Sequence, residues 1–304
     1  MSAGDRLLHA AHVVARMRLK LVMALAHGTW PGRSPVAAMG LSFPSCIGMA
    51  AGLDRYGSMA HLAHRIGIGF VETGTVTTLP EPEHNRGIGV LLRSLEHYGW
   101  MDAGARTGRA RLGISIGRNS WTPPEKAWRD FAECLARGWQ VADYFTLNLG
   151  SLVPALAADR GLLVSFLARI KDRRHALASE RNRRVPILVK LQLREDTRLE
   201  TARLAECIAA FGFDGILAAT GDNGAGKAGP AGLLQHLGAV VEKKTAIVSV
   251  GGIRSPADAI ERLRAGATMI QIHRALLRPG SEIARALGAA TFPHSLGSMP
   301  ALPS

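Results

Sequence analysis

The sequence predicts one (βα)8 TIM barrel preceded by an N-terminal helical extension. Short apolar segments alternate with amphipathic ones about eight times along the 304 residues, which is the repeat of this barrel. A hydrophobic content of 47% with 34 glycines suits one large α/β domain and is too rich in glycine for a helical bundle. We expect a helical extension over residues 1–38, the barrel over residues 39–290 and a tail over residues 291–304.

The N-terminal extension is expected to form a helix over residues 5–26. Arg16, Arg18 and Lys20 interrupt its apolar residues, so no uncharged run approaches the ~20 residues that cross a bilayer. No cleavage pattern typical of a secretory signal follows it. A basic, apolar helix of this kind lies on a membrane surface, or it packs on the barrel bottom or on a partner chain. The sequence leaves these alternatives open.

The barrel strands are expected to be short, apolar and β-branched, because each is covered on both faces. Eight segments fit this description: residues 46–50, 70–73, 112–116, 144–149, 187–191, 215–218, 246–250 and 269–272. Helices are predicted after most of them, over residues 58–65, 125–137, 162–173, 200–211, 231–241 and 256–264. Right-handed crossovers between successive strands then close the barrel.

The last two strands frame the clearest functional signal in the sequence. The strand that ends at Val250 runs into Gly251 and Gly252, and a helix follows with Ser255 as its N-cap. Glycines after a strand permit a tight turn and leave backbone N–H groups for an anion. In this barrel the loops after the last two strands are the usual phosphate site. We therefore expect this turn to bind a phosphate group.

Cysteine usage and charge argue against several other classes of protein. Cys46, Cys134 and Cys207 lie far apart without metal-ligand spacing, so we expect neither disulfides nor a metal site, and a reducing cytoplasm fits. The net charge is +13, from 37 Lys and Arg against 24 Asp and Glu. No aromatic stacking motif interleaves with the basic residues, so nucleic acid is not an expected partner. The basic run over residues 171–184 is expected to be a solvated loop.

Seven short motifs follow one another at the predicted strand ends. They are AAGLDR (50–55), GFVETGTVT (69–77), GISIGRN (113–119), YFTLNLGS (144–151), VPILVK (185–190), DGILAAT (214–220) and VSVGGI (248–253). This ordered set resembles the dihydroorotate dehydrogenases, in particular their class 2, membrane-associated, quinone-linked branch, over about residues 41–287. The resemblance implies an FMN-dependent barrel in which a dihydropyrimidine passes a hydride to N5 of the flavin. A quinone or another acceptor would then take the electrons.

The resemblance also assigns roles to individual residues. Ser151 matches the serine that acts as the catalytic base in class 2, and a serine needs activation by its pocket for that role. Lys190 ends a wholly apolar strand, where a lysine is costly to bury without an anion or an electron-rich ring beside it. It is implied to lie near the pyrimidine edge of FMN and to take part in catalysis. The residues implied to contact the flavin are Ala50, Ala51, Gly52, Thr75, Ser115, Asn148, Lys190, Gly251, Gly252, His273 and Arg274.

The chain also departs from the family pattern at both ends of the expected site. Ser115 replaces a flavin-contacting asparagine, and His273 with Arg274 replaces a Tyr-Ser or Tyr-Thr pair beside the phosphate. The substrate positions are Arg55 in place of a lysine, and Met101, Val153 and Thr220 in place of three asparagines. Losing three amide contacts costs roughly 3 to 6 kcal/mol, a hundred-fold or more in affinity.

Three hypotheses follow from this pattern of retained and lost residues. The first is a divergent FMN-dependent oxidoreductase, which transfers a hydride from a small cyclic substrate other than dihydroorotate. The second is an authentic dihydroorotate dehydrogenase of pyrimidine biosynthesis with rearranged contacts. The third is a non-catalytic barrel that acts as a binding or assembly protein. We favour the first, with the protein in the cytoplasm and peripheral on the inner face of the membrane through its N-terminal helix.

Overall fold

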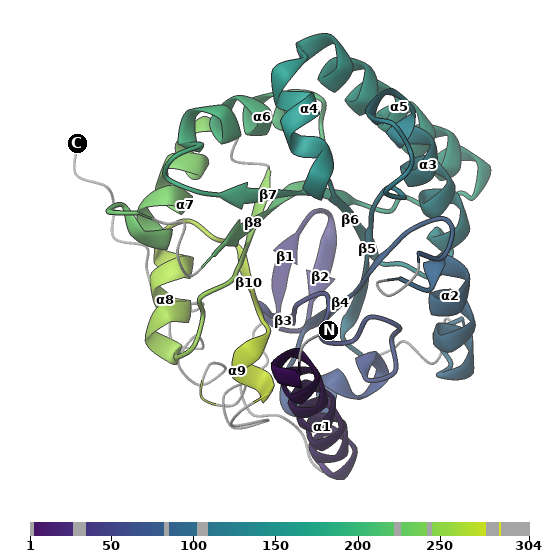
Figure 1. Ribbon diagram of the computed structural model, residues 1–304, viewed down its shortest axis with the longest axis vertical. Coiled ribbons are helices and arrows are strands. Elements are labelled where there is room, and N and C mark those ends of the chain that lie inside the picture. The colour runs from purple at the N-terminus through teal and green to yellow at the C-terminus, as the bar shows by residue number, and fades with distance from the viewer. Residues whose placement is uncertain are drawn as a thin grey trace.

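The computed structural model describes residues 3–26, 35–81, 85–101, 109–221, 226–241, 245–277 and 286. Eight parallel strands close into a barrel in the order β10-β3-β4-β5-β6-β7-β8-β9, and helices surround it (Figure 1). The strands are β3 (Ile47–Met49), β4 (Phe70–Val76), β5 (Arg111–Ile116), β6 (Tyr144–Asn148), β7 (Ile187–Leu193), β8 (Gly215–Thr220), β9 (Ala246–Val250) and β10 (Met269–Ile272). The predicted fold class is confirmed, and all eight predicted strands form.

Helices surround the barrel or follow the ends of its strands. They are the 3-10 helices η1 (Ala60–Ile66), η3 (Pro124–Lys126) and η4 (Gly150–Leu152), and the α-helices α2 (Gly87–His97), α3 (Ala127–Gly138), α4 (Val153–Ala158), α5 (Arg160–Glu180), α6 (Arg198–Ala210), α7 (Gly229–Val240), α8 (Pro256–Arg264) and α9 (Arg274–Leu277). Helix α8 has the predicted bounds, because Ser255 and Asp258 form a reciprocal capping box at its N-terminus. Helix α2 lies outside the predicted set, since it begins in a glycine-rich segment without a side-chain cap.

A hairpin that the sequence did not predict closes the end of the barrel where the strands begin. Strands β1 (Val36–Ala38) and β2 (Leu41–Phe43) pair antiparallel, and they lie across the centre of the barrel in Figure 1. Phe43 is fully buried, with its ring centroid 5.5 Å from that of Phe70 and 6.2 Å from that of Tyr144. This aromatic plug leaves the opposite end, where the strands finish, for a functional site.

The basic run over residues 171–184 is mostly helical, so the prediction of a solvated loop is wrong. Helix α5 continues to Glu180, and Arg174 is buried with Nη1 3.0 Å from the Gly212 carbonyl oxygen. Arg174 and Arg184 both form ion pairs with the buried carboxylate of Asp214. Carboxylate partners allow these arginines to leave water, and a charge count along the sequence does not reveal them.

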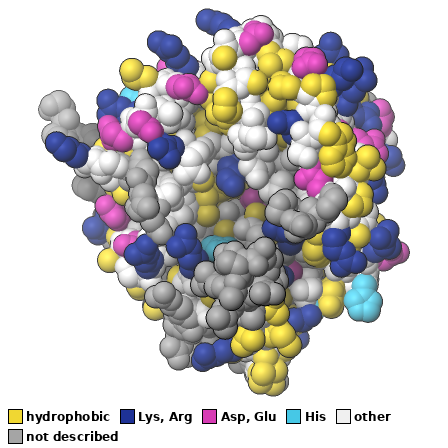
Figure 2. All heavy atoms as spheres, in the orientation of Figure 1, with side chains coloured by type: hydrophobic (Ala, Val, Ile, Leu, Met, Phe, Trp, Pro, Cys, Tyr) yellow, Lys and Arg dark blue, Asp and Glu magenta, His cyan; other side chains and the backbone are white. Residues whose placement is uncertain are grey.

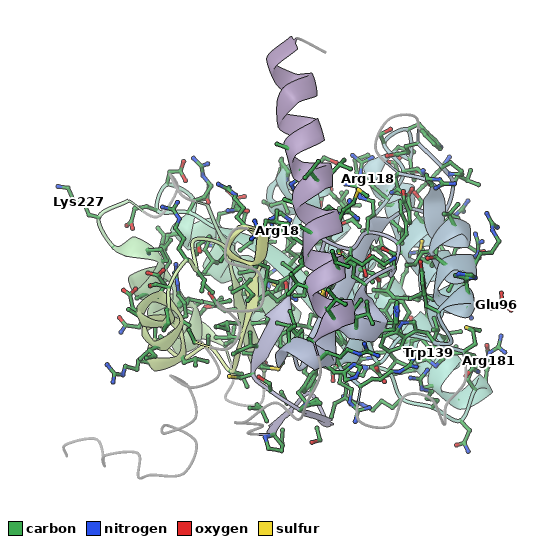
Figure 3. The ribbon with its side chains drawn as sticks, turned by 90° about the horizontal axis from the view of Figure 1, so that it is seen from below. Arg18, Glu96, Arg118, Trp139, Arg181 and Lys227 are labelled. Atoms are coloured by element: carbon green, nitrogen blue, oxygen red, sulfur yellow. The ribbon has the colours of Figure 1, made fainter. Side chains whose placement is uncertain are left out.

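Helix α1 (Ala3–Leu25) packs against η1 and α9, which follow the C-terminal ends of β3 and β10, rather than on the barrel bottom. Its N-terminal part extends beyond the barrel (Figure 3). Leu19 and Met23 are buried against the barrel, whereas the opposite side exposes a row of apolar side chains. These are Val13, Val14, Met17, Leu21 and Leu25, with exposed fractions of 39%, 64%, 68%, 59% and 61%. Among the described residues, no helix has the length and apolarity that crossing a membrane requires.

Candidate active site

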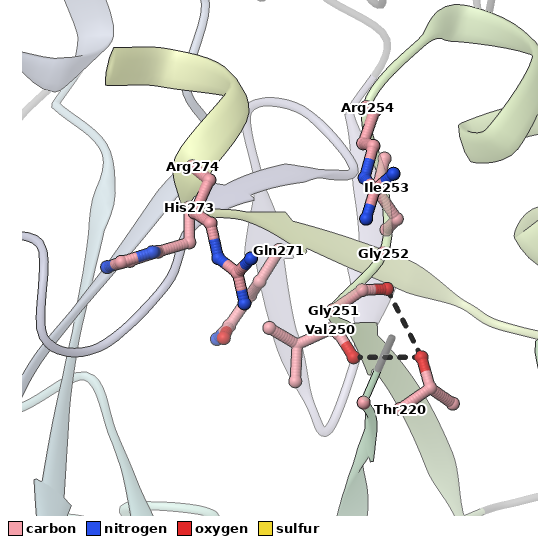
Figure 4. Close-up of a pocket in the computed structure, with 10 residues that line it drawn as sticks. Thr220, Val250, Gly251, Gly252, Ile253, Arg254, Gln271, His273 and Arg274 are labelled. Carbon is pink, nitrogen blue, oxygen red and sulfur yellow. Dashed lines mark hydrogen bonds between the residues drawn. The ribbon is translucent and has the colours of Figure 1, made fainter. Parts of the chain in front are cut away.

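The C-terminal ends of β8, β9 and β10 surround a first pocket, which contains the predicted phosphate turn. The pocket has a volume of about 190 Å³, and Figure 4 shows Arg254 and Arg274 on either side of it. The two arginines provide positive charge for an anion, and the glycine turn provides backbone N–H groups. Its lining residues are Thr220, Gly221, Val250, Gly251, Gly252, Ile253, Arg254, Gln271, His273 and Arg274.

The glycine turn is held from two sides. Gly251 has a φ of +96°, and a Cβ atom added there would lie 2.0 Å from the Thr220 carbonyl oxygen, so only glycine fits. The Thr220 hydroxyl donates to the carbonyl oxygens of Val250 at 3.3 Å and Gly251 at 3.2 Å (Figure 4). From behind, Nη2 of the buried Arg262 lies 3.5 Å from the Gly251 carbonyl oxygen. The turn is therefore fixed before any ligand binds.

Not all backbone N–H groups near the turn face the pocket. The N–H groups of Arg254 and Ser255 both donate to the Asp258 carboxylate at 2.8 Å, as part of the capping box of α8. An anion in this pocket would therefore meet the glycine backbone and the arginine side chains, rather than the first turn of the helix. The sequence analysis assigned the anion to the turn of Gly251 and Gly252, and the structure adds Arg254 to the lining of the same pocket.

His273 links this pocket to the N-terminal helix. Its ring stacks on that of His12 in α1 with centroids 6.1 Å apart. Burial lowers the pKa of His273, and the neighbouring His12, Arg274 and Arg16 add to this effect. A histidine with a lowered pKa is neutral at pH 7, so His273 offers the pocket a hydrogen-bonding ring rather than a charge.

A second pocket, of about 340 Å³, lies over the ends of the remaining strands. A Cβ atom added to Gly52 in this pocket would lie 3.9 Å from Nε2 of His273, so the two pockets meet at these residues. Figure 2 shows a hollow at the centre of this face with Lys or Arg side chains around it. The described lining residues are Ala51, Gly52, Arg55, Gly74, Thr75, Thr77, Glu81, Asn85, Gly117, Arg118, Asn148, Leu149, Gly150, Ser151 and Lys190.

Three residues assigned to the flavin from the sequence form one hydrogen-bonded chain at the edge of the second pocket. Asn148 donates from Nδ2 to Thr75 Oγ1 at 2.8 Å, and Thr75 Oγ1 lies 3.0 Å from Ser115 Oγ. These hydroxyl and amide groups come from β4, β5 and β6, which are neighbours in the barrel. Lys190 on β7 lies beside Asn148 in the strand register and completes this polar edge.

A buried polar layer, which sequence reasoning missed, lies inside the barrel beneath this edge. Glu72 on β4 is fully buried, and its Oε2 accepts hydrogen bonds from Thr146 Oγ1 and Gln271 Nε2, each at 2.9 Å. Burial raises the pKa of Glu72, although the two hydrogen bonds and the charge of Lys190 oppose this. A glutamate inside the apolar segment GFVETGTV was the available signal.

The predicted base is held by a residue that sequence reasoning also missed. Ser151 lies in η4, and its Oγ accepts a hydrogen bond from Nη2 of Arg118 at 3.1 Å. Arg118 follows β5 in the motif GISIGRN, so a polar residue after a barrel strand was the signal. Arg55, Arg118 and Lys190 give the described lining of the second pocket three cations against the single carboxylate of Glu81.

The three positions at which family asparagines are replaced do not converge on the second pocket. Met101 is 52% exposed and precedes the undescribed residues 102–108. Val153 is half-buried and packs against the hydrophobic core around the barrel. Thr220 faces the first pocket, where its hydroxyl is engaged by the turn. The described part of the second pocket therefore contains the amides of Asn85 and Asn148 and none from these three positions.

The sequence and the fold of this chain are similar to those of known proteins. A family model described as dihydroorotate dehydrogenase matches residues 230–289. The chain is 32% identical to the dihydroorotate dehydrogenase (quinone) of Stenotrophomonas maltophilia, covering 81% of this chain and 80% of that protein. It is 32% identical to that of Chromobacterium violaceum, covering 85% of each. The crystal structure of DHODH from Eimeria tenella in complex with ferulenol superposes with a TM-score of 0.76 at 23% identity, covering 93% of this chain and 90% of that chain.

Proposed function

The chain belongs to the dihydroorotate dehydrogenase family, and we propose that it is an FMN-dependent oxidoreductase whose substrate is a small anionic ring compound other than dihydroorotate. One observation carries this proposal. The pocket beside the flavin positions is lined by Arg55, Arg118 and Lys190, while the three replaced asparagine positions contribute no amide to it. Three cations line this pocket while the replaced positions supply no amide to it, so the pocket favours charge over amide pairing.

The described residues fit FMN. The first pocket would hold the phosphate through the Gly251 and Gly252 backbone, Arg254 and Arg274, and its volume of about 190 Å³ is large enough for that group. The Ala51 and Gly52 backbone would lie against the ring, and the N–H of Gly52 already donates to the Gly74 carbonyl oxygen at 3.0 Å. Bound FMN would supply an acceptor for hydride, which no protein side chain provides.

The protein side chains would bind the substrate and remove its proton. Arg55 and Lys190 would attract the anionic group and orient the ring over the flavin positions. Ser151, at the rim of the same pocket, would accept the proton as the hydride leaves. Dihydroorotate would lose about 3 kcal/mol of binding if three amide contacts at about 1 kcal/mol each are missing, which is roughly a hundred-fold in affinity.

Anaerobic mixing of the FMN-loaded protein with dihydroorotate tests this function, with dithionite as a chemical control. We expect dithionite to bleach the flavin absorbance and dihydroorotate to bleach it slowly or not at all. Fast bleaching by dihydroorotate that disappears in Ser151→Ala would instead establish the authentic enzyme. A protein that purifies without colour and does not bind added FMN would support the non-catalytic barrel.

We also propose that α1 docks on the inner face of the membrane and that a quinone takes the electrons. The exposed apolar row of α1 gathers at one edge of the molecule (Figure 2), and Arg16, Arg18 and Lys20 lie on the same helix. The relatives are named as quinone enzymes, which supports the acceptor. Deleting residues 1–30 should abolish cosedimentation with anionic liposomes while the barrel stays folded. Equal cosedimentation of both forms would refute the docking.

A further inference from the structure

Arg118 is held in one orientation by its own loop. Its Nη1 donates to the carbonyl oxygens of Ser120 at 3.3 Å and of Thr122. The loop itself is fixed, because the N–H of Asn119 donates to Asp130 Oδ2 at 2.8 Å. With Nη1 anchored in this way, the planar guanidinium directs Nη2 to Oγ of Ser151 at 3.1 Å. Figure 3 shows Arg118 at the end of the barrel opposite Trp139 and Arg181.

We propose that Arg118 is a positioning residue for Ser151, which holds the hydroxyl toward the substrate and stabilises negative charge on its oxygen. The inference rests on the proposed function, because it gives Ser151 a role in proton removal. An N–H from a permanent cation is a stronger donor than a neutral group, and it favours the deprotonated form of its acceptor. Arg118 thus supplies the activation that a serine base lacks by itself.

Each proton that moves in this transfer has a donor and an acceptor. The hydroxyl oxygen of Ser151 has two lone pairs, and Arg118 occupies one of them. The hydroxyl proton leaves to water, which reaches Ser151 because its side chain is exposed, and the N–H of Arg118 stabilises the negative charge that develops on Oγ. The lone pair freed in this way would accept the proton from the substrate carbon as the hydride leaves, which restores the hydroxyl. The arginine stays protonated throughout, so its role is electrostatic rather than acid–base.

Two features of the surroundings favour a functional rather than a structural role. Nε of Arg118 is buried and has no hydrogen-bond partner among the described residues, so the side chain is not placed to satisfy all of its own donors. Glu81, the carboxylate on the same pocket wall, instead accepts from the Ser120 N–H and from Asn119 Nδ2. In the described structure no ion pair with a carboxylate neutralises the guanidinium, and its charge acts on Ser151.

A thiol at position 151 makes this effect measurable without flavin or substrate. Ser151→Cys places a titrating group at the same site, and a neighbouring arginine lowers the pKa of a thiol. We would measure the rate of iodoacetamide alkylation against pH on the full chain, following the peptide that contains position 151 by mass spectrometry. This peptide readout separates the new thiol from Cys46, Cys134 and Cys207.

In Ser151→Cys with Arg118→Gln, we expect the pH midpoint of alkylation to rise by about one unit and the rate at pH 7 to fall about tenfold. Arg118→Lys should restore part of the shift, because it keeps the charge. Arg169→Gln, which removes a cation stacked on Trp128 at the outer surface, should leave the midpoint unchanged. A purely steric role for Arg118 would change the rate equally at every pH.

Equal midpoints with and without Arg118, in variants whose circular dichroism shows a folded barrel, would overturn the proposal. This result does not depend on FMN, substrate or turnover. A failure here is therefore distinct from a failure of the proposed oxidoreductase function. If Arg118→Gln does not fold, the pH midpoint of alkylation is compared between the chain with Arg118 and Arg118→Lys. The lysine variant should have the higher midpoint, since a lysine ammonium keeps the charge but cannot repeat the fork that joins the loop to Oγ. Equal midpoints would again overturn the proposal.

Discussion

Replacing Gly251 by alanine should damage both the fold and the phosphate pocket. Its φ of +96° is costly for any residue with a Cβ atom, by about 1 to 2 kcal/mol. The new Cβ atom would also lie 2.0 Å from the Thr220 carbonyl oxygen and 3.0 Å from its carbonyl carbon. Carbon atoms pack at about 3.5 to 4.0 Å, so β8 and the turn must separate. Overpacking of this kind adds about 1 to 3 kcal/mol.

Gly266 offers a matched control for the backbone contribution alone. Its φ is +103°, close to that of Gly251, but a Cβ atom added there meets nothing within 4 Å. Gly266→Ala should therefore cost only the conformational term of about 1 to 2 kcal/mol. Gly251→Ala should cost about 2 to 5 kcal/mol, because the steric term is added to the same conformational term. The difference between the two variants isolates the contact with Thr220.

Urea unfolding and FMN titration of both variants would test this reasoning. Gly251→Ala should weaken FMN binding at least tenfold, which corresponds to about 1.4 kcal/mol, whereas Gly266→Ala should bind FMN like the unmodified chain. Equal unfolding free energies for the two alanine variants would refute the steric argument. Unchanged FMN affinity in Gly251→Ala would show that the glycine turn does not bind the cofactor.

Two further predictions concern stability. Burial, with help from Lys20 and other cations, lowers the pKa of His61 to about 4 from 6.5, so unfolding takes up a proton between these values and stability falls as the pH drops through that window. His61→Phe keeps the stack on Tyr98 but cannot take up a proton. In urea titrations its unfolding free energy should fall less between pH 7 and pH 5 than that of the unmodified chain, and equal decreases would contradict this. Asp214→Asn should cost about 3 to 5 kcal/mol in the same assay, since it leaves the buried Arg174 without its charge partner, and a loss below about 1 kcal/mol would count against the ion-pair argument.

Much of the fold follows from local chemistry that a sequence displays. Buried parallel strands must be apolar on both faces, so segments such as residues 187–191 are visible as short β-branched runs between polar loops. The capping box of α8 is visible in the same way, because Ser255 and Asp258 are three residues apart and need no tertiary partner. The order of strand-end motifs then indicates the family.

Features that depend on distant partners escape a sequence analysis. The hairpin of β1 and β2 has only three residues per strand, and its burial depends on aromatic rings from β4 and β6. Arg174 looks solvated until Asp214, 40 residues later, is placed beside it. The contact between Arg118 and Ser151 spans 33 residues and depends on the path of a loop. Single motifs identified the strand ends, but their mutual geometry required the closed barrel.

Glu72 shows how this barrel keeps an acid beneath its site, and its charge state can be tested by stability alone. Because burial raises its pKa above the ordinary value of 4.5, the stability that the protonated acid contributes is complete below pH 4.5 and is lost as the pH rises through the folded pKa. Glu72→Gln cannot ionise, yet its carbonyl oxygen can accept the same bonds from Thr146 and Gln271.

As the pH rises from 5 to 8, the unfolding free energy of Glu72→Gln should therefore increase relative to that of the unmodified chain. The difference should change by up to about 1.4 kcal/mol per pH unit. Urea titrations across this range would measure the difference, and Glu180→Gln on the exposed end of α5 should show none. A constant deficit for Glu72→Gln at every pH would mean that the carboxylate is ionised in the folded chain, where the charge of Lys190 acts on it. In that event the lysine beneath the flavin positions would be neutralised from inside the barrel, and the cationic character of the pocket would rest on Arg55 and Arg118 alone.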